Sequence, residues 1–178
     1  MLVPLVILAA WILASGSIDD TNYVPLFVAD SEAEIETLRA AATEAGIILY
    51  RPRDNEAGRA IEWRPREDAS ILGRVLHTWT GVAGDKQPDL MRFPTFPVYV
   101  PAWVARTVAR TYVALRGVER PDNPGRRVQI QEDRSAQFRE RVVSLLERVG
   151  SPHTVRGDSW PIYVVDETAE SLYELPEV

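Results

Sequence analysis

The chain begins with an apolar run. Residues 2–14 carry no charged side chain, and Asp19 is the first charged residue. A helix over residues 2–18 would be about 25 Å long, slightly less than the hydrocarbon core of a bilayer at about 30 Å. The run predicts a hydrophobic N-terminal anchor over residues 1–18, kept in the mature protein. The alternatives are a cleaved signal peptide, although no Lys or Arg precedes the run, and a segment buried in the fold.

An α/β pattern follows over residues 22–80. Ser31 and Glu34 have the spacing of a capping box, and the apolar positions after them recur with helical periodicity. Asp68 is suited to cap a second helix, whose buried stripe would include Ile71 and Val75. The predicted elements are a strand over 23–29, a helix ending at Gly46, strands over 47–50 and 59–63, and a helix after Asp68.

The same order of elements returns over residues 126–178. Gly150 repeats Gly46 at a shift of 104 positions (150 − 46), and the same shift pairs Ser135 with Ser31. The predicted elements are a strand over 128–131, a helix ending at Gly150 with Phe138, Val142, Leu145, Leu146 and Val149 buried, strands over 152–156 and 160–165, and a closing helix over 168–175.

These patterns predict an α+β fold. After the N-terminal hydrophobic helix, each of two small two-layer α/β units has the order strand-helix-strand-strand-helix, because a small sheet needs helices to cover one face. The alternative is a single ferredoxin-like domain with a long insertion.

A connector, residues 81–125, separates the two units. Prolines near both of its ends predict extended or turning segments. Residues 102–117 instead have helical periodicity, with Arg106 and Arg110 opposite the apolar face. A basic amphipathic helix of this kind either lies in a membrane interface or packs against its own domain.

Composition narrows the range of functions. Hydrophobic residues make up 46% and charged residues 26% of the 178 positions, a balance typical of a globular protein. The net charge is −6 and the acidic residues are spread along the chain, so no basic stripe is available to neutralise phosphates. We therefore expect no nucleic-acid partner. The chain has no cysteine, which excludes disulfides and thiolate metal sites.

The sequence offers few residues for catalysis. His77 and His153 are the only histidines, and they fall in different halves. Ser151, His153 and Asp158 could form a nucleophile-histidine-carboxylate set, but the local pattern is not that of a nucleophile elbow. Phosphate-binding loops, dinucleotide fingerprints and EF-hand spacing are also missing. The prediction is a protein that is not an enzyme and holds no cofactor or metal.

A family resemblance rests on two stretches. VPLFVADSEAEIETLRAAATEAGI, at residues 24–47, and IYVVDETAESLYEL, at residues 162–175, resemble small prokaryotic signal-transducing proteins with a ferredoxin-like or ACT-like fold. The resemblance implies a binding module and supplies no catalytic residue. The N-terminal anchor and the connector depart from it.

These observations together predict a non-catalytic accessory or scaffold subunit, anchored in a membrane, that holds other subunits of a respiratory or photosynthetic complex together. Its partners would be those subunits and the lipid around the anchor, and its body would lie on the extracytoplasmic side. Aromatic and arginine side chains dominate interfaces, so the candidate contact residues are Trp11, Tyr99, Trp103, Arg106 and Arg110. The alternatives are an ACT-like sensor of a small ligand and an extracytoplasmic hydrolase.

Overall fold

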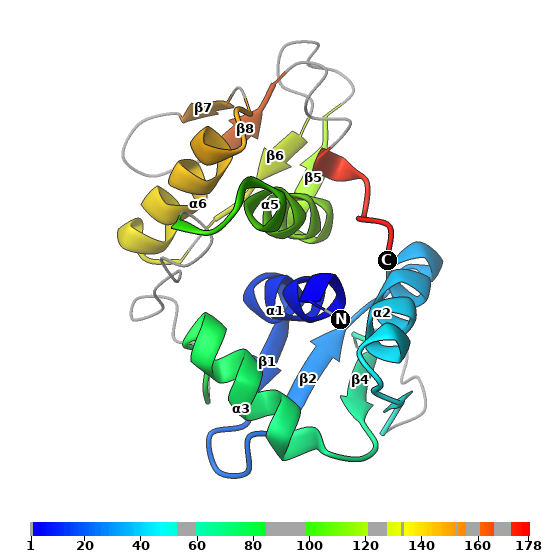
Figure 1. Cartoon of the computed structure of the whole chain (residues 1–178). Coiled ribbons are helices and arrows are strands. Elements are labelled where there is room, and N and C mark those ends of the chain that lie inside the picture. Colours follow the sequence, from blue (N-terminus) through cyan, green and yellow to red (C-terminus); the bar gives the residue numbers. More distant parts are fainter. Residues whose placement is uncertain are drawn as a thin grey trace. The chain divides into compact units, whose positions relative to one another are not determined.

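The chain folds into two units, each built around one antiparallel sheet (Figure 1). Unit 1 comprises Met1–Lys86 with Pro176–Val178, and unit 2 comprises Gln87–Leu175. The computed structural model describes residues 2–52, 60–84, 99–120, 128–132, 134–151, 153–155, 161–165 and 172–178. The two-unit α+β organisation predicted from the sequence is confirmed.

Unit 1 places three helices against a four-stranded sheet of order β1-β2-β4-β3. All strand pairs are antiparallel, and the register places Phe27 opposite both Gly16 and Trp63. The helices and strands are, in chain order, α1 (Leu2–Ser15), β1 (Gly16–Ile18), β2 (Pro25–Val28), α2 (Glu32–Glu44), β3 (Leu49–Tyr50), β4 (Glu62–Pro65) and α3 (Ala69–Thr80).

The apolar run at the N-terminus forms α1, the central helix of unit 1. It contacts α2, α3, β1 and β2, and the residues from Val6 to Ala14 are all buried. A helix that is buried on every side needs apolar residues all round, which is the same pattern that a membrane helix has. At 14 residues α1 is about 21 Å long. In the part of the chain that the structure describes, no helix is both long and apolar enough to cross a bilayer. The membrane anchor predicted for residues 1–18 is therefore wrong.

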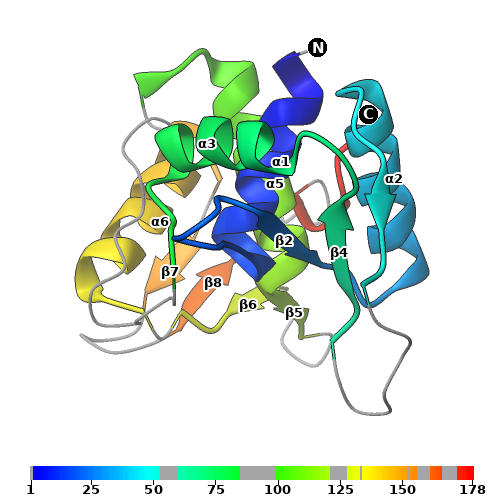
Figure 2. The ribbon, with the colours of Figure 1, turned by 90° about the horizontal axis from the view of Figure 1, so that it is seen from below.

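Unit 2 repeats the element order of unit 1. The amphipathic helix of the predicted connector is α5, which belongs to this unit, and the sheet order is β5-β6-β8-β7, as Figure 2 shows for the four strands. The described elements are α5 (Ala102–Arg116), β5 (Gly117–Glu119), β6 (Val128–Ile130), α6 (Ala136–Arg148), β7 (His153–Val155) and β8 (Ile162–Val164). Both units therefore share the order helix-strand-strand-helix-strand-strand, which α3 follows in unit 1.

The matching sequence positions have matching structural roles. Ser31 and Ser135 are the N-cap residues of α2 and α6, and each side chain accepts a hydrogen bond from the backbone N–H three residues later. Gly46 and Gly150, which follow the two helices, both have positive φ, at 77° and 70°. Only glycine adopts that conformation without a steric penalty, so the two helices stop in the same way.

Helix α1 of unit 1 and helix α5 of unit 2 each run directly into a strand that begins with a glycine. A Cβ atom on Gly16 would stand 2.7 Å from the Leu26 carbonyl oxygen, and one on Gly117 would stand 2.4 Å from Cγ1 of Val128. These glycines let the end of the helix lie flat against the neighbouring strand.

Several local predictions for unit 1 were wrong. Asp68 has a left-handed backbone and makes no capping bond with its side chain. Ile71 and Val75 are exposed, at 62% and 36%, because α3 approaches the rest of unit 1 on another flank. There a Cβ atom on Gly73 would stand 1.6 Å from the Tyr23 carbonyl oxygen. The strand predicted over 47–50 contains β3, and the strand predicted over 59–63 overlaps β4 at residues 62–63.

Candidate functional site

The outer face of the unit 2 sheet is polar. One row across β5, β6 and β8 consists of Val118, Gln129 and Tyr163. The residues before and after each of them in the strand belong to the opposite face of the sheet. On the opposite face of the sheet, four apolar side chains are buried on the side of the helices: Val128, Ile130, Ile162 and Val164. Gln129 and Tyr163 are half-buried and Val118 is exposed, so this row can be reached from solvent.

Hydrogen bonds connect the polar side chains of this face. Arg120 donates through Nε to the amide oxygen of Gln129 at 2.8 Å, and Gln129 donates through Nε2 to the amide oxygen of Gln131 at 3.2 Å. At the end of α5, Arg116 donates through Nη2 to the Gln131 carbonyl oxygen at 3.2 Å. The Arg120 guanidinium thus lies beside the Gln129 carboxamide, and the Arg116 guanidinium lies beside the Gln131 main chain. We call Arg116, Arg120, Gln129 and Gln131 the polar row.

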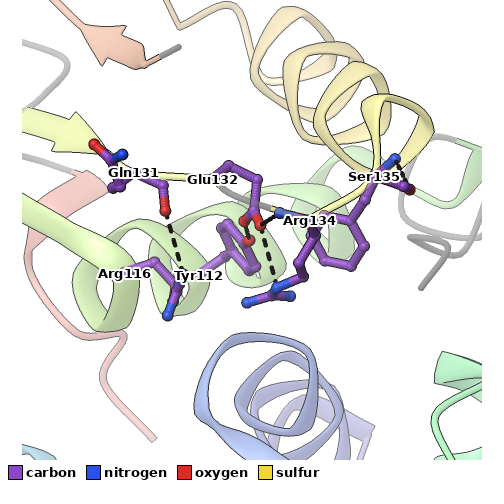
Figure 3. Close-up of polar contacts among 7 residues, drawn as sticks. Tyr112, Arg116, Gln131, Glu132, Arg134 and Ser135 are labelled. Carbon is purple, nitrogen blue, oxygen red and sulfur yellow. Dashed lines mark hydrogen bonds and ion pairs between the residues drawn. The ribbon is translucent and has the colours of Figure 1, made fainter. Parts of the chain in front are cut away.

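A buried charge cluster lies behind the polar row (Figure 3). Glu132 is fully buried and accepts a short hydrogen bond from the Tyr112 hydroxyl, while Nε of Arg134 lies 3.1 Å from its other carboxylate oxygen. The Arg134 guanidinium also stacks over the Phe138 ring, 4.3 Å from its centre. Burial raises the pKa of Tyr112 well above its ordinary value of 10, so its hydroxyl stays a donor at neutral pH. The cluster joins α5 to the segment after β6 and thereby fixes the position of Gln131.

The outer face of the unit 1 sheet has a different chemistry. Its middle row contains Ser17, Leu26, Arg64 and Tyr50. Arg64 is on β4, the strand between β2 and β3. Nη2 of Arg64 is 3.8 Å from a Glu62 carboxylate oxygen, and both side chains are 40% exposed. The Nε of Arg64 has no hydrogen-bond partner among the described residues. This guanidinium is therefore only loosely held.

A depression of about 470 Å³ opens beside Arg64. The loop between β1 and β2 forms one wall, in which Asp19 accepts hydrogen bonds from the backbone N–H groups of Thr21 and Asn22, both at 2.9 Å. These two bonds lower the pKa of the Asp19 carboxyl below its ordinary value of 3.8. The wall is thus a fixed turn with an ionised carboxylate. Gly84 closes the other side, and its N–H donates to the Ile18 carbonyl oxygen at 2.8 Å.

The candidate contact residues chosen from the sequence lie elsewhere. Trp11 is fully buried in unit 1 and donates through Nε1 to the Val28 carbonyl oxygen at 2.7 Å. Arg110 donates to the carbonyl oxygens of Glu174 and Leu175 in unit 2. The remaining three are exposed: Tyr99, which precedes α5, and Trp103 and Arg106 in the first half of α5.

His77 is the histidine whose side chain the structure describes. Nδ1 of His77 lies 3.0 Å from the Val82 carbonyl oxygen, and its ring packs edge-on against Tyr23, so this histidine has a packing role. The side chain of His153, and all of Asp158, lie outside the described residues. Within the described ranges, no three His, Asp or Glu side chains are grouped so that they could hold a metal ion.

Known structures with a similar fold do exist. No protein-family model matches the chain, and no curated protein matches it. The crystal structure of the N-terminal LAGLIDADG domain of DUF199/WhiA superposes with a TM-score of 0.59 and 12% identity, covering 99% of this chain and 83% of that one. The structure of I-DmoI in complex with DNA and Mn superposes with a TM-score of 0.56 and 10% identity, covering 99% and 98%. At these identities the likeness shows a shared fold.

These comparisons correct several sequence-based predictions. The resemblance to ferredoxin-like or ACT-like signal-transducing proteins is wrong, because the similar structures are LAGLIDADG domains. The predicted scaffold role, the membrane-complex and lipid partners, and the extracytoplasmic location all depended on an anchor that is a core helix of unit 1. The exclusion of nucleic acid is also contradicted, since a structure with this fold was solved bound to DNA. What the comparisons establish for this chain is the two-unit fold of the LAGLIDADG domain of WhiA and of I-DmoI.

Proposed function

We propose that this protein binds double-stranded DNA through the outer faces of its sheets and does not cleave it. The observation that carries the proposal is the polar row of unit 2, found on a fold that in I-DmoI was solved with DNA. Strands are one of the two element types that enter the major groove, where base edges can be read.

The side chains of the polar row suit base edges. A carboxamide pairs with the N6 and N7 atoms of adenine, and a guanidinium fork pairs with the O6 and N7 atoms of guanine. Gln129 and Gln131 offer the first chemistry, and Arg120 offers the second. Their mutual hydrogen bonds hold these groups in place before DNA arrives, which reduces the entropy lost on binding.

Electrostatics should contribute modestly to the affinity. The chain as a whole has a net charge of −6, so attraction to phosphates depends on local arginines such as Arg116 and Arg120. A protein that neutralises few phosphates loses little affinity as salt rises, with a slope of about −0.9 per phosphate in a plot of log K against log salt. We therefore expect a shallow salt dependence.

The absence of cleavage is inferred from the residues at the C-terminal ends of α1 and α5. The nine letters of the name LAGLIDADG can be read as one-letter residue codes and compared with residues 8–16, LAAWILASG. The two agree at five positions: Leu8, Ala9, Ile12, Ala14 and Gly16. The two acidic letters fall on Leu13 and Ser15. At the corresponding end of α5, Arg116 precedes Gly117.

This difference concerns metal binding. Divalent cations such as Mg²⁺ and Mn²⁺ are held mainly by carboxylate oxygens, and they promote phosphodiester hydrolysis by stabilising the attacking and leaving oxygens. Ser15 instead donates its hydroxyl to the Val28 carbonyl oxygen at 3.3 Å, and Arg116 carries a positive charge. Neither residue suits a cation site. DNA binding without hydrolysis is the function that these side chains support.

Equilibrium binding tests the proposal. Fluorescence anisotropy of a labelled duplex of mixed sequence, titrated with the full chain at low and physiological salt, should show saturable binding with a shallow salt slope. A single strand of the same sequence should bind more weakly, because it lacks a major groove. A chain that binds neither duplex nor single strand at low salt would overturn the proposed function.

A further inference from the structure

The depression in unit 1 is lined by a weakly paired guanidinium, that of Arg64, and by the carboxylate of Asp20. Arg64 reaches it from β4, on the outer face of the sheet, and the β1–β2 loop brings Asp20 to the same depression. Its volume of about 470 Å³ is large enough to admit the edge of a base pair.

Arg64 is available for a new partner. Its ion pair with Glu62 has an N–O distance of 3.8 Å, and both side chains are 40% exposed, so water competes for the contact. Its Nε atom is buried and unpaired within the described part of unit 1, which leaves the two terminal nitrogens as the fork that a ligand would meet. A planar fork of this kind pairs with two adjacent acceptor atoms.

Asp20 supplies an acceptor in the same depression. The neighbouring Asp19 is occupied by the backbone N–H groups of Thr21 and Asn22, whereas Asp20, among the described residues, accepts a single long hydrogen bond, 3.3 Å, from the Thr21 hydroxyl. Oδ2 of Asp20 would lie 3.0 Å from a Cβ atom on Gly84, so the glycine leaves room for the carboxylate. The lining of the depression thus includes both a two-nitrogen donor fork and a carboxylate acceptor.

We propose that Arg64 and Asp20 read a G·C base pair in the major groove. Guanine presents two neighbouring acceptors there, N7 and O6, and its cytosine partner presents the N4 amino donor. The Arg64 fork would bind guanine and the Asp20 carboxylate would accept from cytosine N4. An A·T pair lacks two adjacent acceptors, because the adenine amino group separates N7 from thymine O4. This inference rests on the proposed binding of duplex DNA and adds sequence specificity to it.

Selection from a pool of duplexes with a randomised core tests the assignment. The full chain is incubated with the pool, and the bound duplexes are recovered and sequenced over several rounds. Wild-type protein should enrich G·C at one position. Arg64→Lys keeps the charge but lacks the fork, so it should lose that preference by about 5- to 150-fold while enrichment at other positions persists. Arg64→Gln should lose it as well.

Arg66→Lys is the matched control, because Arg66 is exposed and follows β4 outside the depression. It should select the same sequences as the wild type. If Arg64→Lys and Arg64→Gln retain the wild-type G·C preference, or if the wild type enriches no G·C position, the assignment is wrong although duplex binding stands. If the wild type recovers no duplex at low salt, the proposed function itself fails.

Discussion

Inside unit 2, the Tyr112 hydroxyl donates a hydrogen bond to the Glu132 carboxylate, and this bond links α5 to the segment that follows β6. Both side chains are fully buried, and Arg134 supplies the compensating positive charge. A buried carboxylate is tolerated only when it is paired and hydrogen-bonded. The cluster therefore supports the polar row from behind.

Replacing Tyr112 with Phe should destabilise unit 2. The substitution removes one donor from buried Glu132 and leaves Arg134 in place, so the free energy of unfolding should fall by about 1–3 kcal/mol. Urea unfolding at neutral pH measures the change. Tyr99→Phe is the control, because Tyr99 is 78% exposed, and it should change stability by less than about 0.5 kcal/mol. Equal effects of the two substitutions would show that the Tyr112 hydroxyl contributes nothing.

The lowered pKa of Asp19 should be visible as a pH dependence of stability. Because the folded-state pKa lies below the unfolded value, Asp19 stabilises the fold above about pH 3.8 and loses this contribution as the pH falls through the folded value. Asp19→Ala should therefore lower Tm more at about pH 7 than at about pH 3. Asp19→Asn keeps the acceptor without the charge, so its difference from Asp19→Ala should not vary with pH. A Tm gap between wild type and Asp19→Ala that widens at acid pH would contradict the assignment.

Gly117 should not tolerate even a methyl group. A Cβ atom there would stand 2.4 Å from Val128 Cγ1 and 2.5 Å from the Val113 carbonyl oxygen, so the end of α5 would have to move away from β6. We expect Gly117→Ala to lower the free energy of unfolding by about 1–3 kcal/mol. Gly46→Asn tests whether space is the cause, because nothing lies within 4 Å of that position and Asn accepts positive φ. Gly117 has a φ of −77°, which any residue adopts, so an unchanged free energy of unfolding in Gly117→Ala would contradict the steric account.

Incubation with Mn²⁺ or Mg²⁺ should leave bound DNA intact. Supercoiled plasmid is the most sensitive substrate, since one nick converts it to the relaxed form seen on a gel. We expect no nicking above the level of a protein-free control, because Ser15 and Arg116, at the ends of α1 and α5, offer no carboxylate to a cation. Metal-dependent nicking that follows the purified chain would show that other residues supply the cation site.

The buried face of α6 could be predicted from the sequence because one side of this helix is buried and the other is not. Phe138, Val142, Leu145 and Leu146 are buried in α6 as the periodicity predicts, and the capping box at Ser31 is present. The N-terminal run was misread for a physical reason. A helix surrounded by protein on every side and a helix surrounded by lipid both need apolar residues all round.

The candidate site depends on information that a single strand does not carry. Arg120 and Gln129 meet because of the register between β5 and β6, and Arg64 meets the β1–β2 loop across the unit 1 sheet. The net charge of −6 was equally misleading, because binding depends on where charges lie on a face. A row of Arg and Gln at alternating positions, as at Gln129 and Gln131, was the one available signal.

A comparison of two double variants tests the DNA-binding face most directly. The first variant, Arg120→Ala with Gln129→Ala, removes two members of the polar row. The second, Arg106→Ala with Gln137→Ala, removes the same two residue types from exposed positions on α5 and α6. Anisotropy with one labelled duplex at fixed salt gives the dissociation constants. We expect the first variant to bind about 10- to 100-fold more weakly and the second to bind like the wild type. Equal affinities of the two variants would contradict DNA binding through the sheet.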